Sequence, residues 1–321
     1  MSHNISHASG RAEIAYAGEH PWHSLGTPIP DNASMEEVIE AAGLDWTVST
    51  QPIFQRLPNN KSFREVAGHQ LIVRDDTQDI LGVTGDRFTP LQNLEAFKAM
   101  ESRIRPLGAR YDVAGALGVG ETVWVSARLS SFEVQKGDAL DRFLLLTNGH
   151  DGKHSLRILI ACRRVVCQNT LILALAEGQG KGFRGVHSAL LKGKLSGAVD
   201  EVLEVEGIYK QAEEAYGRML TVRMNKEQVD QYFKKVFKIA EKNENDKPSR
   251  VLAELSERFD APTNRVGNMA GTVWAAYQAA VEAVDHGGRR TQLDARAKSL
   301  LFGPGAITKA RAFEEAVALI K

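Results

Sequence analysis

The side chains best suited to nucleophilic or acid–base chemistry lie in one segment in the middle of the chain. Cys167 directly precedes a predicted helix start and follows Arg163 and Arg164. Positive charge and a helix dipole at such a position lower the pKa of a thiol. His150 and Asp151 are neighbours and could form an acid–base pair. Cys167, His150 and Asp151 are therefore the candidate catalytic residues of a thiol or acid–base enzyme.

In this enzyme hypothesis, a base for Cys167 could come from His150, His154 or His187, with Asn169 as the orienting amide. The structural alternative is a buried, unreactive thiol, because free cysteine is among the most buried residue types and two valines precede this one. The histidine candidates equally suit turns, where they bind local amides. No spacing of carboxylates, cysteines or histidines typical of a catalytic or metal site is present. The sequence therefore favours a protein that is not an enzyme and that needs no metal or cofactor.

The clearest functional signal is positive charge. Between Lys153 and Lys194 there are eight Lys or Arg residues and one acid, Glu177, whereas the whole chain has a formal net charge of zero. Read with a period of two, the strand SLRILIACRR places Arg157 and Arg163 on one face. Arginines along a strand can follow a phosphate backbone by charge without reading bases. The alternative is that acids of a helix near residues 200–214 neutralise these cations inside the protein.

A second strand adds an aromatic side chain to this hypothesis. In ETVWVSARL, Trp124 and Arg128 fall on the face opposite Val123 and Val125. Such a pair can stack a nucleobase and meet a phosphate, although a tryptophan covered by the protein itself is the alternative. The candidate nucleic-acid-binding residues, which include two from the loop GQGKGFRG, are Arg157, Arg163, Arg164, Lys181, Arg184, Trp124 and Arg128.

The strand and helix patterns predict an α+β protein. Ser34 and Glu37 form a capping-box pattern at the start of a short helix that Gly43 ends. Period-two strands are expected at 46–85 and 110–162. Helices are expected at 91–104, for two turns from residue 170, and as one long helix at 195–219, after which the chain is expected to be helical. We expect an antiparallel sheet domain with packed helices over 1–190, irregular at 1–33, and a helical region over 191–321.

Composition bounds the class of protein. The chain has 321 residues, of which 43% are hydrophobic and 25% charged, and it has no apolar run long enough to cross a membrane. The segment MSHNISHASGRAE lacks the apolar core of a secretory signal, so we expect a cytoplasmic protein.

The motifs of the chain resemble those of a known family. The segment GHDGKHSLRILIACRRVVCQNTLILAL, together with PWHSLG, LGVTGDRFTPLQN and LFGPGAITKARAFEEAV, is similar to the phage/plasmid-like protein family built on domain of unknown function 932. The resemblance spans nearly the whole chain. It implies a protein encoded by phages or plasmids and acting inside a bacterial cell, and it implies no particular activity.

Together these observations lead to one expected function and two rivals. We expect a non-enzymatic accessory of a mobile element that binds nucleic acid, with single-stranded DNA annealing or protection as its role and a homo-oligomer as a candidate form. The first rival is the thiol or acid–base enzyme described above. The second is a host-factor-binding protein that acts through its helical half.

Overall fold

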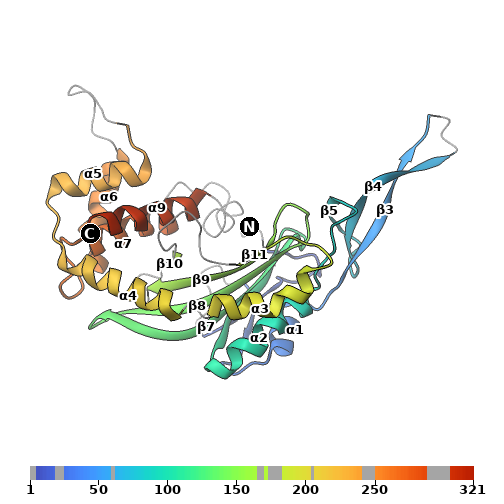
Figure 1. The fold of residues 1–321 in the computed structure, drawn as a ribbon, viewed down its shortest axis with the longest axis horizontal. Helices are drawn as coiled ribbons and strands as arrows, with labels where there is room; N and C mark the ends of the chain where they lie inside the picture. Colours follow the sequence, from blue (N-terminus) through green and yellow to red (C-terminus); the bar gives the residue numbers. More distant parts are fainter. Residues whose placement is uncertain are drawn as a thin grey trace. The chain divides into compact units, whose positions relative to one another are not determined.

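The computed structural model describes residues 5–18, 25–58, 62–164, 170–172, 183–203, 206–240, 250–287 and 304–321. It confirms the α+β class. One sheet has the strand order β10-β9-β8-β7-β6-β1-β2, with β11 beside β9, and a second sheet has the order β3-β4-β5 (Figure 1). Strand β1 is parallel to β2, whereas the pairs β1–β6, β6–β7, β9–β10, β9–β11, β3–β4 and β4–β5 are antiparallel.

The strands of the two sheets are β1 (Ile14–Ala17), β2 (Thr27–Ile29), β3 (Val48–Arg56), β4 (Phe63–Arg74), β5 (Ile80–Gly85), β6 (Arg110–Leu117), β7 (Thr122–Gln135), β8 (Asp138–Gly149), β9 (Leu156–Arg164), β10 (Thr170–Ile172) and β11 (Phe183–Gly185). The α-helices are α1 (Met35–Ala42), α2 (Asn93–Ile104), α3 (Leu191–Leu203), α4 (Glu206–Thr221), α5 (Lys226–Phe237), α6 (Arg250–Phe259), α7 (Val273–His286) and α9 (Pro304–Ala318).

The chain divides into two compact units that are not continuous in sequence. Unit 1 comprises residues 1–129, 144–159 and 182–203, and unit 2 comprises residues 130–143, 160–181 and 204–321. This division differs from a single boundary near residue 190, because α3 belongs to unit 1 and parts of β7, β8 and β9 belong to unit 2.

Local sequence signals account for the first helix of unit 1. The Ser34 hydroxyl accepts a hydrogen bond from the Glu37 amide, and the Glu37 carboxylate accepts one from the Ser34 amide, which is the predicted capping box. Gly43 ends the helix in the left-handed conformation that glycine adopts at low cost. Met35 and Val38 are fully buried on the inner side of this helix.

The predicted irregular arm over residues 1–33 is wrong in part. Ile14–Ala17 and Thr27–Ile29 are strands, and Ile14, Ala15 and Tyr16 pair with β6. These strands are four and three residues long, and they form by pairing: β1 pairs with β6, and β2 pairs with β1. A local sequence pattern of this length carries little information.

Two helix predictions are also corrected. Residues 170–172 form a strand, β10, which pairs with Ala161–Arg163 of β9, instead of beginning a helix. Thr, Leu and Ile suit an edge strand, and the ladder with β9 outweighs the helical signal. The single long helix expected over 195–219 is two helices, α3 and α4, which belong to different units.

The helical part of unit 2 is built on an aromatic core. Trp274 and Tyr277 of α7 contact Tyr216 of α4, with ring centroids 4.7 Å apart for Trp274 and Tyr216. The indole N–H of Trp274 donates a 2.8 Å hydrogen bond to Asp138 of β8. Among the described residues, no helix is long and apolar enough to cross a membrane.

Candidate functional site

The turn between β8 and β9 lies against β5 in unit 1. Gly82 of β5 meets the backbone of Asp151 so closely that a Cβ at Gly82 would lie 2.6 Å from it, and Gly152 approaches Thr84 in the same way. The side-chain amide of Asn148 donates to the carbonyl of Leu91 at 2.8 Å. Glycine at these positions therefore lets the turn pack tightly onto the strand.

Within this turn the acid–base contact joins Asp151 to His154. One carboxylate oxygen of Asp151 accepts from the backbone amides of Lys153 and His154, and the other lies 2.6 Å from Nδ1 of His154. Burial raises the pKa of Asp151, but these hydrogen bonds outweigh it, and the net pKa is lowered. The His154 side chain is 38% exposed, so a charged carboxylate orients a solvent-accessible imidazole.

His150 has a different environment from the one the acid–base hypothesis needs. Its side chain is fully buried, Nε2 lies 2.9 Å from the Asn93 side-chain oxygen, and its ring meets Trp46 edge-on. The Asn93 amide nitrogen donates to two carbonyls, so the asparagine oxygen is the acceptor and Nε2 of His150 carries the proton. Burial lowers the pKa of His150 to about 3, and that of the nearby His187 to about 4. Both histidines are therefore neutral at pH 7.

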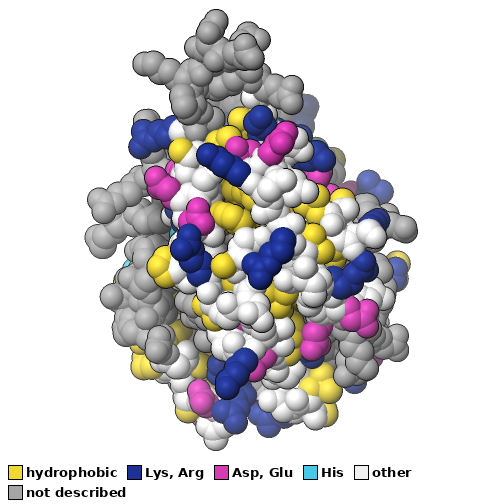
Figure 2. Space-filling view, turned by 90° about the vertical axis from the view of Figure 1, so that its left-hand side faces the viewer, with side chains coloured by type: hydrophobic (Ala, Val, Ile, Leu, Met, Phe, Trp, Pro, Cys, Tyr) yellow, Lys and Arg dark blue, Asp and Glu magenta, His cyan; other side chains and the backbone are white. Residues whose placement is uncertain are grey.

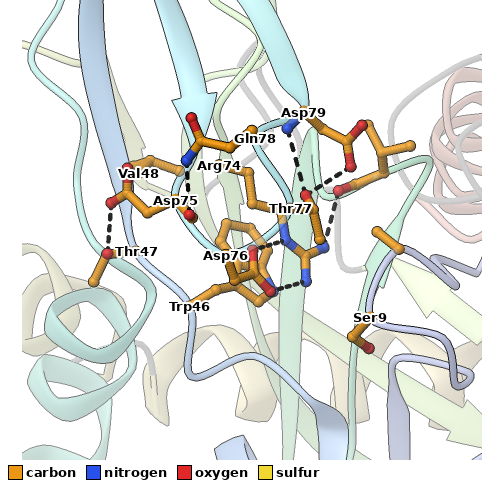
Figure 3. Close-up of polar contacts among 12 residues, drawn as sticks. Ser9, Trp46, Thr47, Val48, Arg74, Asp75, Asp76, Thr77, Gln78 and Asp79 are labelled. Atoms are coloured by element: carbon orange, nitrogen blue, oxygen red, sulfur yellow. Dashed lines mark hydrogen bonds and ion pairs between the residues drawn. The ribbon is translucent and has the colours of Figure 1, made fainter.

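Arg74, which no sequence motif singled out, is fully buried at the end of β4 (Figure 3). Its guanidinium donates five hydrogen bonds, two to Glu13, two to Asp76 and one to the Val119 carbonyl, and it stacks on Trp46 at 4.3 Å from the ring centroid. Burial opposes the charged form, but the hydrogen bonds to Glu13 and Asp76 raise the pKa of Arg74 above its usual value. With every donor satisfied and no side-chain exposure, this arginine holds β4, the amino-terminal segment and the β6–β7 turn together.

Burial along β7 alternates as the period-two pattern predicts. Val123, Val125 and Ala127 are fully buried, while Trp124 and Arg128 are half-buried. The first row faces the core, and the second row lies on the opposite face of the sheet.

The core face of this sheet is the one that the helices of unit 1 cover. Helix α1 contacts β6, α3 contacts β11, and α1, α2 and α3 lie along one side of the sheet (Figure 1). We call the opposite side the outer face. Arg110 pairs directly with Arg128 across β6 and β7, so both belong to the outer face. Gly115 makes room there for Trp124, since a Cβ at Gly115 would lie 2.7 Å from its ring.

A second arginine pair lies on the outer face. Arg184 of β11 is directly opposite Arg157 of β9, and Gly185 is directly opposite the fully buried Leu156. A Cβ at Gly185 would collide with Leu191 of α3, which identifies the Gly185 side as the helix-covered side. Arg157 and Arg184 therefore point to the outer face. Burial, and after it the charge of Arg184, lowers the pKa of Arg157.

The four outer-face arginines differ in their surroundings. Arg110 is exposed and forms a 3.3 Å ion pair with Asp31. Arg184 is exposed and its Nε donates to the Ser155 hydroxyl at 3.1 Å. Arg157 is half-buried, as Arg128 is.

Two of the acids that were expected to neutralise the basic segment have other partners. Asp200 binds Arg103 of α2 at 2.6 Å, and Glu213 binds Arg142 at 3.3 Å. Of the segment's lysines, Lys192 pairs with Glu95. The side chains of Arg163 and Arg164, and all of Lys181 and Cys167, lie outside the described residues.

The helices of unit 2 present a mixed surface. Figure 2 shows Lys and Arg side chains spread over its visible face with Asp and Glu between them. An open hollow on α5 of about 510 Å³ illustrates this mixture, since it is lined by Lys226, Glu227, Asp230, Gln231 and Lys234. This face therefore has no single sign of charge.

The described part of the chain offers no evident metal or thiol chemistry. Among the described residues, no group of three or more His, Cys, Asp or Glu side chains could hold a metal ion. Cys162 is fully buried, and burial raises the pKa of its thiol to about 12.

Comparison with known proteins gives the family. The chain belongs to the family described as Domain of unknown function (DUF932), which matches residues 80–312 and so more than half of the 321 residues. This confirms the family expected from the sequence. No curated protein and no solved structure matches the chain.

Proposed function

We propose that this protein binds single-stranded nucleic acid, in the first instance DNA, through the outer face of the unit 1 sheet. It acts as a non-enzymatic accessory of a phage or plasmid in strand annealing or protection, inside the bacterial host cell. The mobile-element setting rests on the family resemblance, and the binding mode rests on the residues of the outer face.

The observation that carries this proposal is the direct pairing of Arg157 with Arg184. Like charges opposite each other on neighbouring strands destabilise a sheet. Burial is the main cause of the lowered pKa of Arg157, and the Arg184 charge lowers it further. A phosphate over this pair accepts hydrogen bonds from both guanidinium groups.

The rest of the outer face suits a single strand better than a duplex. Arg110 and Arg128 form a second pair of the same kind. Trp124 lies on the same face, two side-chain positions along β7 from Arg128. Stacking on an aromatic ring requires an unpaired base, and arginines beside it follow the backbone without reading sequence.

Fluorescence anisotropy with labelled single-stranded DNA at about 50 mM salt tests this proposal. We expect the Arg157→Ser/Arg184→Ser variant to bind at least about tenfold more weakly than the parent chain, because two phosphate contacts are lost. The matched control, Lys226→Ser/Lys234→Ser on α5, removes the same charge from the mixed surface and should bind within about twofold of the parent. The proposal fails if the parent does not bind, or if both variants lose affinity equally.

A second function, acid–base catalysis, is favoured by one contact. The 2.6 Å contact between Asp151 and Nδ1 of His154 orients an accessible imidazole, whereas His150 is buried against Asn93. The expected base is then His154. Incubation with single-stranded DNA, RNA and a chromogenic phosphodiester tests this function: turnover that His154→Gln abolishes would support it, and no turnover by the parent chain would remove it.

A further inference from the structure

The second sheet of unit 1 extends into a two-stranded ribbon. Strand β5 pairs only with His69–Val73 of β4, whereas Phe63–Glu65 of β4 pair with Phe54–Arg56 of β3. Figure 1 shows β3 and β4 continuing past the end of β5. An isolated two-stranded ribbon is marginally stable in water, so this outer segment gains from a partner that buries one of its faces.

One face of the ribbon carries two exposed phenylalanines. Phe54 is 55% exposed and Phe63 is 65% exposed. The register passes from the pair Pro52–Gln70 to the pair Phe54–Glu65. The extra residues of this irregularity lie in β4. In β3 the side chains therefore alternate between the two faces without interruption. The Phe54 side therefore continues the side that is buried at the base of the sheet.

At that base the same side is part of the protein core. Val48 and Thr50 lie on this side of β3, and their partners Arg74 and Ile72 on β4 are fully buried. The face that is buried at the base of the sheet thus continues along the ribbon to Phe54 and Phe63, where it is exposed.

The charges on this face are balanced. Glu65 lies directly opposite Phe54, and Arg56 lies directly opposite Phe63. The four side chains form a square with the phenylalanines on one diagonal and the two opposite charges on the other. One positive and one negative charge do not favour a polyanion, whereas they complement a second copy of the same face.

The edge of the ribbon is less suited to a partner than its face. The backbone N–H of Val48 donates to the side-chain oxygen of Gln92 at 3.0 Å, and the side-chain nitrogen of Gln92 donates to the Val48 carbonyl at 2.9 Å. The Gln92 side chain therefore occupies the outer edge of β3 at its base. Pro52 lies on the same edge and has no N–H to donate. Both features discourage strand addition.

We propose that the face formed by Phe54, Arg56, Phe63 and Glu65 binds the same face of a second copy of this chain. A two-fold axis along the phenylalanine diagonal places each phenylalanine on its own counterpart and Arg56 on Glu65 of the partner. The strands of the two ribbons then cross at near right angles, a known packing of sheets.

The buried area sets the expected strength. A phenylalanine side chain has a surface of roughly 200 Å², of which about 60% is exposed here, so the four rings of two copies bury about 480 Å² in the dimer. Stable interfaces bury on the order of 1,200 Å² or more, so the ribbons alone predict a weak, reversible dimer.

Sedimentation velocity over a range of protein concentrations up to about 1 mM, the range of a weak complex, tests this inference. The parent chain should show reversible dimerisation. Phe54→Ser/Phe63→Ser should raise the dissociation constant at least about tenfold, because it removes the apolar centre of the interface. Arg56→Glu and Glu65→Arg should each weaken the dimer, and the Arg56→Glu/Glu65→Arg variant should return it to within about threefold of the parent.

Matched controls separate this result from other outcomes. Arg64→Glu changes a charge on the opposite face of the ribbon and should leave the dissociation constant unchanged. A parent chain that stays monomeric, or a charge-exchanged variant that does not recover, overturns the inference. It is also overturned if Phe54→Ser/Phe63→Ser keeps the dimer but loses DNA binding, because the ribbon would then contact nucleic acid. None of these outcomes depends on whether the outer-face arginines bind DNA.

Discussion

Replacing Arg74 by methionine should destabilise unit 1 more than any surface change. The substitution keeps an unbranched side chain of similar length, but it leaves the buried Glu13 carboxylate without its partner and removes five hydrogen bonds. Breaking a buried ion pair by removing one member costs about 3–5 kcal/mol. Because Glu13 and Arg74 both have 0% side-chain exposure, solvent screening does not reduce this value.

Two further variants separate the contributions. Asp76 is 40% exposed, so Asp76→Asn should cost only about 1 kcal/mol. Arg74→Met/Glu13→Leu removes both buried charges and should be less destabilised than Arg74→Met alone, since an apolar pair avoids the unpaired charge.

Hydrogen exchange of the β4 amides, measured by mass spectrometry, reports the opening free energy of unit 1 itself in a chain with two units. Arg265→Met is the control, because Arg265 and its partner Asp260 are both more than half exposed in unit 2. A loss below about 1 kcal/mol for Arg74→Met, or a double variant worse than the single one, would refute this reasoning.

Three other predictions follow from buried groups. Burial lowers the pKa of His150 to about 3 and that of His187 to about 4, below the usual value of 6.5. At a pH between the lowered pKa and 6.5, the unfolded chain binds more protons than the folded chain. Stability is therefore lost as the pH falls below about 6.5. At pH 5 each histidine should cost about 2 kcal/mol relative to pH 7, and His187→Phe should remove its share of this pH dependence in hydrogen exchange. Cys162, with a pKa of about 12, should react with iodoacetamide at pH 8 on the order of 100-fold more slowly in the folded chain than in urea, as peptide mass spectrometry can show. Gly115→Val should lower the melting temperature, because its side chain would collide with Trp124.

Local signals predicted the elements that local interactions stabilise. The Ser34 and Glu37 capping box begins α1, and Gly43 ends it, as the sequence alone indicates. The strands of the β3–β4–β5 sheet and the β6–β7 hairpin also follow from period-two patterns and turn residues. These features need only neighbours a few residues away.

Elements formed by distant contacts could not be predicted in the same way. Strands β1 and β10 are short and owe their conformation to pairing with β6 and β9. Leu94 lies within the helical pattern predicted over 91–104 and yet is 42% exposed, because the helical period alone does not fix the width of the covered face.

The site shows the same division. Asp151, His150 and His154 were all candidates from the sequence, but the choice of His154 over His150 as the partner of Asp151 depends on the three-dimensional path of the turn. The pairing of Arg184 with Arg157 requires the register of β11 on β9. The sequence signal for Arg74 was a charged residue directly after the short apolar run Leu71–Val73.

Arg157 and Arg184 are proposed to contact phosphates, and the salt dependence of single-stranded DNA binding tests this contact most directly. Each phosphate contact contributes about 0.7 to the slope of log K against log salt concentration for single strands. The Arg157→Ser/Arg184→Ser variant should therefore show a slope shallower than that of the parent by about 1.4. A slope that is unchanged in this variant would contradict the claim, even if its affinity were reduced.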